Sequence, residues 1–184
     1  MNTIISLLNN PSVAAFVGAF SAFFLVALTD WRRKNSRKRL LVKRLKILKV
    51  IAQAKLETAQ TSIEMIRNNR FSSAPVMEFP SDFRVMQREA FNVLSSTQIN
   101  AIDALIYWME SIDGIFERAR IIAEELHVLS KNEAPTQQRS QKGEELINEF
   151  QQAETNLGHF VTMASMYINK EPEKILEYRV KHSD

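Results

Sequence analysis

An uncharged run of seventeen residues near the N-terminus most constrains what this chain can form. The run extends from Val13 to Thr29, is rich in Ala, Val and Phe, and is followed directly by Asp30 and Trp31. A bilayer core of about 30 Å needs roughly 17–25 apolar residues in a helix, and Trp is enriched at its edges. The sequence therefore predicts a transmembrane anchor, with residues 1–30 forming it and a short extracytoplasmic N-terminus.

The charges that flank this run predict its orientation and weigh against a cleavable signal peptide. A signal peptide has basic residues before its apolar core, whereas residues 1–12 contain none. Residues 30–50 hold ten Lys or Arg and one Asp, a net charge of +9. Because positive flanks stay in the cytoplasm, we expect a single-pass protein of the inner (cytoplasmic) membrane, with the N-terminus outside and residues 31–184 in the cytoplasm. The absence of cysteine suits that reducing compartment.

Beyond the anchor the sequence is helical in pattern, and proline residues separate the segments. Apolar residues recur every three or four positions over about 37–69, 97–131 and 140–169. Ser95 and Gln98 have the spacing of a capping box at the start of the second segment. The sequence therefore predicts an all-α protein, in which the transmembrane helix continues into a cytoplasmic antiparallel bundle of three long helices.

The predicted core of the bundle consists of the apolar positions that recur along these helices. Residues 71–80 contain two prolines and no period, so we expect a loop, and Ser81 with Asp82 then caps a short helix that covers one end and stops near Leu94. Pro172 is expected to end the last helix and leave a charged tail. The predicted core positions are Leu41, Leu45, Leu48, Ala52, Leu56, Ala59, Ile63 and Ile66; Ile102, Leu105, Met109, Ile112, Phe116, Ala119, Ala123 and Leu126; and Gly143, Leu146, Phe150, Ala153, Leu157, Phe160, Ala164 and Tyr167.

Small residues share one face of the predicted span. Ala14, Gly18 and Ala22 follow one another at four-residue intervals, and Ser21 lies beside them. Small residues at this spacing let two membrane helices approach closely, which favours a homo-oligomer. A ring of such spans would enclose a nearly apolar pore with Ser21 as its main polar lining. The alternative is that Ala and Gly are simply common in membrane spans.

Basic residues follow the span immediately. Topology alone requires positive charge at this position, and contact with anionic lipid headgroups is a further expected role. No aromatic residues alternate with these charges, as stacking of bases would require, so we do not expect specific nucleic-acid binding. The predicted membrane-surface cluster is Arg32, Arg33, Lys34, Arg37, Lys38, Arg39, Lys43 and Arg44.

Arg120 and His127 are the one pair with a catalytic precedent. Six residues separate them, so they lie two helical turns apart. The spacing resembles the Arg-x4-6-His signature of the HEPN superfamily of helical ribonucleases, in which the two residues of two protomers meet and cleave RNA. In this chain Ile121 follows the arginine, where that family usually has a polar residue. Two solvated residues on a charged helix give the same pattern, so we do not predict an enzyme.

The order of elements as a whole resembles the membrane accessory protein of type VI-B CRISPR systems. The resemblance lies in one N-terminal span, a basic juxtamembrane helix, a small helical bundle and the Arg-x6-His spacing. It implies a ring-shaped membrane pore that enhances antiviral defence by an RNA-guided effector. Glu124 is the only possible second ligand at helical spacing from any of the three histidines, where it precedes His127, and Gly-rich phosphate loops are absent, so neither a metal nor a cofactor is expected.

Three functions therefore follow as hypotheses. The first is an oligomer that forms a pore in, or permeabilises, the inner membrane, as an accessory of CRISPR-linked defence. The second is a membrane tether whose bundle recruits a cytoplasmic protein or a CRISPR effector through an apolar helix face. The third is a HEPN-like ribonuclease.

Overall fold

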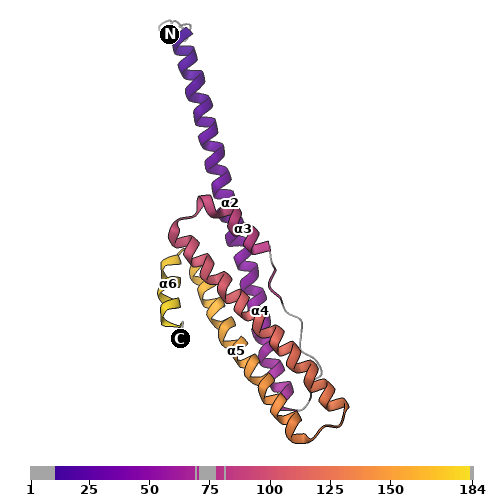
Figure 1. The fold of residues 1–184 in the computed structure, drawn as a ribbon. Coiled ribbons are helices and arrows are strands. Elements are labelled where there is room, and N and C mark those ends of the chain that lie inside the picture. Colours follow the sequence, from indigo (N-terminus) through magenta and orange to yellow (C-terminus); the bar gives the residue numbers. More distant parts are fainter. Residues whose placement is uncertain (1–10, 69, 71–77, 81, 183–184) are drawn as a thin grey trace.

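The computed structural model describes residues 11–68, 70, 78–80 and 82–182, with side chains from residue 19 onward. Across these residues every regular element is a helix, as the periodicity predicts, so the all-α class is confirmed (Figure 1). The elements are α2 (Pro11–Arg67), α3 (Asp82–Ala90), the short 3-10 helix η1 (Phe91–Val93), α4 (Ser96–Lys131), α5 (Thr136–Ile168) and α6 (Pro172–Lys181).

The longest helix, α2, has two different surroundings along its length. It contains 57 residues and is therefore about 85 Å long. Its C-terminal part lies in the bundle, where the buried positions begin at Leu41 and end at Ile66, and its N-terminal part runs out beyond the other helices (Figure 1). No proline follows Pro11 in this helix, so the sequence supplies no kink between the two parts.

The core lies between α2, α4 and α5, and α5 packs along both of the other two helices. The predicted core positions are confirmed: all are buried except Leu56 and Leu126, which are half-buried. Phe150 and Phe160 of α5 are among the largest fully buried side chains. Each buried Leu, Ile or Phe contributes about 1.5–3 kcal/mol by leaving water, so this one continuous core stabilises the fold.

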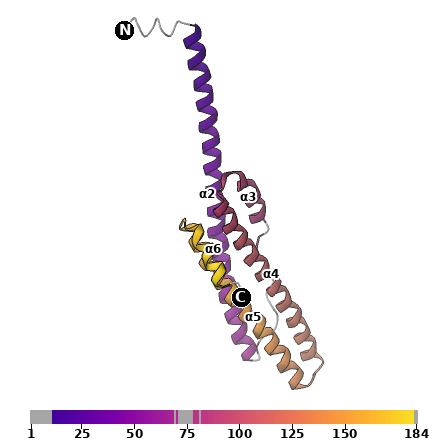
Figure 2. The same cartoon turned by 60° about the vertical axis from the view of Figure 1, so that its left-hand side comes forward.

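The directions of the helices differ from an alternating bundle. α2 and α4 run the same way, and α5 runs opposite to both (Figures 1 and 2). The fourteen residues between Arg67 and Asp82 explain the difference, because a chain of that length reaches about 46 Å when extended and can return along the whole bundle. The short helix α3, which was expected to cover one end of the bundle, packs against α2, and its Gln87 also hydrogen-bonds to Asp103 of α4.

The ends of the helices follow local chemistry, with one correction. The capping box before α4 is confirmed: the Gln98 N–H donates to Ser95 Oγ at 3.3 Å, and the Ser95 N–H donates to Gln98 Oε1 at 3.1 Å. Residues 78–80 are non-helical as predicted, whereas residues 71–77 and Ser81 lie outside the described part. Pro172 was expected to end the last helix and leave a charged tail; α5 ends at Ile168, and Pro172 instead begins a further helix, α6, in whose first turn an N–H has no helical acceptor.

Candidate functional site

The N-terminal part of α2 exposes a continuous apolar surface. We call residues 19–36, the described side chains that precede the bundle, the projecting segment. Phe23 is 72% exposed and Trp31 is 60% exposed; between them Phe24, Leu25 and Val26 are similarly open, whereas Leu28 is half-buried. Thr29 Oγ1 donates to the carbonyl oxygens of Leu25 and Val26, both at 2.8 Å, so its hydroxyl is satisfied within its own helix. A soluble monomer rarely exposes apolar surface of this extent, which marks a site of contact with a membrane or another protein.

A helix that crosses a membrane must be both apolar and long enough to span the hydrocarbon core. Among the residues that were described, no helix has an apolar stretch long enough to cross a membrane. Residues 13–18 belong to the uncharged run but have no described side chains, so the side-chain packing predicted for Ala14 and Gly18 lies outside the described residues. Ser21 and Ala22 lie among them and are exposed.

The basic cluster divides into two groups. Arg37 Nη1 donates to the carbonyl oxygen of Glu89 at 3.2 Å, and Arg44 forms an ion pair with Asp82, so these two arginines hold α3 against α2. The others project from α2 and are exposed, apart from the half-buried Lys38. All eight residues were predicted to lie at the membrane surface, whereas Arg37 and Arg44 position α3. The remaining six are Arg32, Arg33, Lys34, Lys38, Arg39 and Lys43.

Arg120 lies on the surface of α4 and is held by two carboxylates. Its Nη2 is 2.7 Å from Glu117 Oε1, and its Nη1 is 2.5 Å from Glu124 Oε1. The hydrogen bonds that Arg120 donates to Glu117, together with the charges of both glutamates, raise the pKa of the Arg120 guanidinium. A guanidinium already neutralised on both sides has little positive charge left to offer a phosphate.

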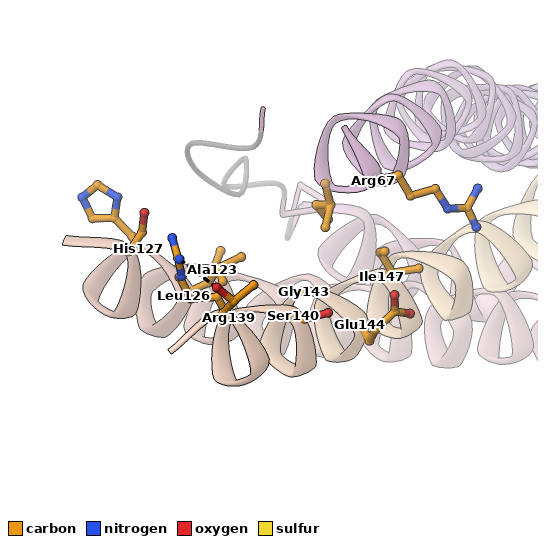
Figure 3. A pocket seen from close by; sticks show the side chains of 12 residues that line it. Arg67, Ala123, Leu126, His127, Arg139, Ser140, Gly143, Glu144 and Ile147 are labelled. Atoms are coloured by element: carbon orange, nitrogen blue, oxygen red, sulfur yellow. Dashed lines mark hydrogen bonds between the residues drawn. The ribbon is translucent and has the colours of Figure 1, made fainter. Parts of the chain in front are cut away.

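His127 lies elsewhere, in a cleft of about 600 Å³ at the end of the bundle far from the projecting segment (Figure 3). Arg67 and Arg139 also line this distal cleft, but Arg120 does not. Figure 3 shows His127 and Arg67 at opposite ends of the cleft, with Arg139 between them. Within one chain, then, the structure does not bring Arg120 and His127 into one acid-base set. Among the described residues there is also no group of three His, Asp or Glu that could hold a metal ion.

A buried ion pair at the centre of the bundle was missed in the sequence. Lys55 of α2 is only 2% exposed, and its Nζ lies 3.4 Å from Asp113 Oδ1 of α4. The same ammonium lies over the ring of Phe79, 4.2 Å from the centroid, and 5.2 Å from that of Phe116. Burial lowers the pKa of Lys55, against the attraction of Asp113. Because Asp113 Oδ1 also accepts the Phe79 N–H at 3.0 Å, the pair fastens residue 79 to the bundle.

The spacing of the core positions along α2 already indicates that Lys55 is buried. The buried positions of α2 follow one another at steps of four and three from Leu41 through Ala52, and the next position in that alternation is 55. A lysine at a core position signals a buried partner, because an uncompensated charge is too costly to bury.

No model of a protein family, no curated protein and no solved structure matches this chain.

Proposed function

We propose that this protein is a single-pass membrane protein in which one unbroken helix, α2, begins in the bilayer and continues into a cytoplasmic bundle. The observation that carries the proposal is the exposed apolar surface of the projecting segment, on the same helix as the core positions from Leu41 to Ile66. From Pro11 to Thr29 the helix has nineteen residues and a length of about 28 Å, close to a hydrocarbon core. The exposed basic residues that follow belong in the cytoplasm.

The anchor is tested with paired substitutions on two apolar surfaces. In the first variant Phe23→Asp and Val26→Asp place two charges in the projecting segment. The control variant, Val128→Asp and Val180→Asp, places the same charges at two exposed apolar positions of the bundle. Membranes of expressing cells are washed with alkaline carbonate, which leaves only inserted proteins behind.

The two variants should differ sharply. We expect the parent protein and the control to stay in the membrane pellet and the first variant to move to the supernatant, because a charge at the centre of a span costs about 2.5–3.5 kcal/mol. If the parent is extracted, or if both variants stay, the helix does not insert.

Assembly through the span is the second proposal, and it leads to a pore in the inner membrane. It is supported by the four-residue spacing of Ala14, Gly18 and Ala22 and by the continuity of α2, through which a rearrangement of the bundle would reach the span. The order of elements and the Arg120 to His127 spacing are the support for a place in CRISPR-linked defence. A tether without a pore is the competing form of the same anchored architecture.

Oligomeric mass separates the pore from the tether. We would measure the mass of the detergent-solubilised protein by light scattering, corrected for bound detergent, in the parent and in Gly18→Leu. The control is Ala27→Leu, nine residues further on and therefore on the opposite side of the helix. A closed ring that is lost with Gly18→Leu and kept with Ala27→Leu favours the pore. A monomer or dimer in all three proteins favours the tether.

A further inference from the structure

A second cleft, of about 930 Å³, lies at the end of the bundle where α2 leaves it. We call it the proximal cleft. It is formed by residues 35–46 of α2, the start of α4 and the turn between α5 and α6. Figures 1 and 2 both place the start of α4 and the α5–α6 turn at this end. The cleft therefore faces the side from which the projecting segment emerges.

The rim of the proximal cleft is strongly basic. Glu173 is its one carboxylate, against five cationic side chains. These cations take part in no ion pair or side-chain hydrogen bond with other described residues, in contrast to Arg37 and Arg44 on the same helix. Like charges gathered around a concavity repel one another, so the arrangement favours binding of an anion. The five are Lys38, Arg39, Lys43, Lys46 and Lys170.

One of these cations occupies a strained backbone position. Lys170 has a φ of 65°, in the left-handed region, just beyond the last turn of α5. Its N–H donates to the Tyr167 carbonyl at 3.1 Å, and the Glu171 N–H donates to that of Met166 at 3.0 Å. This is a Schellman ending, whose left-handed position is usually glycine. A lysine there gives up local stability and brings a fifth positive charge to the cleft.

The cleft is apolar beneath this basic rim. Val42, Leu94 and Tyr167 line it, and burial raises the pKa of the Tyr167 phenol to about 12, so that hydroxyl stays neutral. Thr97, in the first turn of α4, adds a hydroxyl beside the partly positive end of that helix. A ligand that fits this cleft has negative groups for the rim and an apolar part for the floor.

We propose that the proximal cleft binds a small ligand that carries two or more phosphate groups. From Lys38 to Lys46 the row of cations extends about 12 Å along α2, which is room for more than one phosphate. Lys side chains bind phosphate as mobile point charges, and Arg39 adds a planar donor. The ligand is either a lipid headgroup with several phosphates or a soluble polyphosphate. The lipid source rests on the proposed membrane anchoring, whereas the soluble source does not.

The distance to the bilayer makes the two sources separable. Lys38 lies nine residues beyond Thr29, about 14 Å along the helix, and Lys46 lies about 26 Å beyond it. The headgroup layer is only about 5–8 Å thick, so simple headgroups stay below the cleft when α2 is upright. A lipid ligand would therefore require tilt of α2 or a headgroup that stands out from the surface.

The test compares two triple variants of the full-length protein that lose the same charge. The cleft variant carries Lys43→Gln, Lys46→Gln and Lys170→Gln. The control variant carries Gln at all three positions of the exposed run Arg32–Lys34, which is nearer to the proposed bilayer and outside the cleft. Inorganic tripolyphosphate is titrated calorimetrically into detergent-solubilised protein. In the second arm, the protein is released from phosphatidylcholine nanodiscs that also contain cardiolipin, and its retention of cardiolipin is measured by native mass spectrometry.

We expect at least one probe to bind the parent, to lose about tenfold or more in affinity or retention in the cleft variant, and to change by less than about twofold in the control. Tripolyphosphate binding alone identifies a soluble ligand, and cardiolipin retention alone identifies a lipid. If neither probe binds the parent, or if both variants lose binding equally, the proposal is wrong. Equal thermal unfolding midpoints show that the variants are folded. If carbonate extracts the parent protein, the proposed membrane anchor is wrong. The proposal that the cleft binds a soluble polyphosphate would not be affected by that result.

Discussion

His159 Nδ1 of α5 and the hydroxyl oxygen of Tyr178 of α6 lie 2.8 Å apart and share a hydrogen bond. The His159 ring also packs against Trp108 of α4 and against His182, each with centroids 5.0 Å apart. Tyr178 in turn stacks on His182 at 4.2 Å. This aromatic cluster fastens α6 to α4 and α5, and two of its rings are imidazoles.

Acid should loosen α6. Burial, and after it the charge of His182, lowers the pKa of His159 below its ordinary value of 6.5. A histidine whose folded pKa is depressed contributes its full stability above the unfolded pKa and loses it as the pH falls through the folded pKa. We expect amide hydrogen exchange, expressed as protection factors, to show weaker protection of residues 173–181 at about pH 5.5 than at about pH 7.5.

Two substitutions identify which histidine is responsible. His159→Phe keeps the ring but cannot be charged, so protection of α6 in this variant should no longer fall with acid. His182→Gln removes the other imidazole of the cluster and should retain most of the pH dependence. The assignment to His159 fails if the opposite pattern is observed.

The buried ion pair should respond asymmetrically to loss of either partner. Asp113→Asn leaves the ammonium of Lys55, only 2% exposed, without its carboxylate, and we expect a loss of about 3 kcal/mol in the free energy of unfolding. Lys55→Met keeps the volume and removes the buried charge, while Asp113, 31% exposed, retains water and the Phe79 N–H. That variant should lie within about 1 kcal/mol of the parent.

The pH dependence of the same pair provides a second readout. A lysine with a lowered folded pKa binds fewer protons in the folded than in the unfolded state over the window between that pKa and 10.5. Stability of the parent relative to Lys55→Met should therefore rise as the pH increases within this window. Urea unfolding at several alkaline pH values, followed by circular dichroism, measures the difference, and a falling or flat difference would contradict the assignment.

The comparison of sequence with structure shows what local patterns can determine. The three-four spacing predicted the core faces, and the Ser95 and Gln98 pattern predicted the start of α4, because both depend only on residues within one helix. The predicted core included Leu56 and not Lys55, because leucine is the more hydrophobic residue, although the strict alternation points to position 55. Its partner Asp113 lies 58 residues away and has no local signal.

Long-range arrangement was the part that the sequence could not provide. The parallel course of α2 and α4 depends on a connection of fourteen residues whose path no periodicity encodes. The proximal cleft likewise combines Lys43 of α2 with Lys170, which lies beyond the end of α5, more than a hundred residues later. Basic residues were recognised as a cluster along one helix, but the concave surface that they share with other elements appears only in three dimensions.

A glycine within α5 is expected to be replaceable with a gain in stability. A Cβ added at Gly158 would meet nothing within 4 Å, and glycine in a helix interior costs about 0.8–1.0 kcal/mol relative to alanine. Gly158→Ala should therefore raise the free energy of unfolding by about that amount. Gly143→Ala is the control for a buried site, because its Cβ would make an ordinary contact of 3.7 Å with Ile66 Cγ2. A loss of stability or of oligomeric mass only in Gly158→Ala would mean that another subunit packs there.

The two non-glycine residues with left-handed backbone offer a direct test of whether strain at the proximal cleft serves binding. Lys170 has a φ of 65° after α5, and Glu133 has a φ of 51° after α4, where the Ala134 N–H donates to the Leu129 carbonyl at 3.0 Å. Both helices thus end in the motif that favours glycine at this position. Lys170→Gly and Glu133→Gly should each stabilise the protein by about 1 kcal/mol, since the left-handed conformation costs a side-chain-bearing residue roughly that much.

Only one of the two should change ligand binding. Lys170→Gly removes a cation from the proximal cleft, so tripolyphosphate affinity or cardiolipin retention should fall while the unfolding midpoint rises. Glu133→Gly relieves the same strain at the opposite end of the bundle and should raise the midpoint with no effect on either probe. If Lys170→Gly alone raises stability and lowers binding, the lysine contributes to the ligand site at a cost in stability. A residue with a purely structural role at this position would be more stable as glycine. Equal effects of both substitutions on binding would instead assign the change to general stability and remove Lys170 from the site.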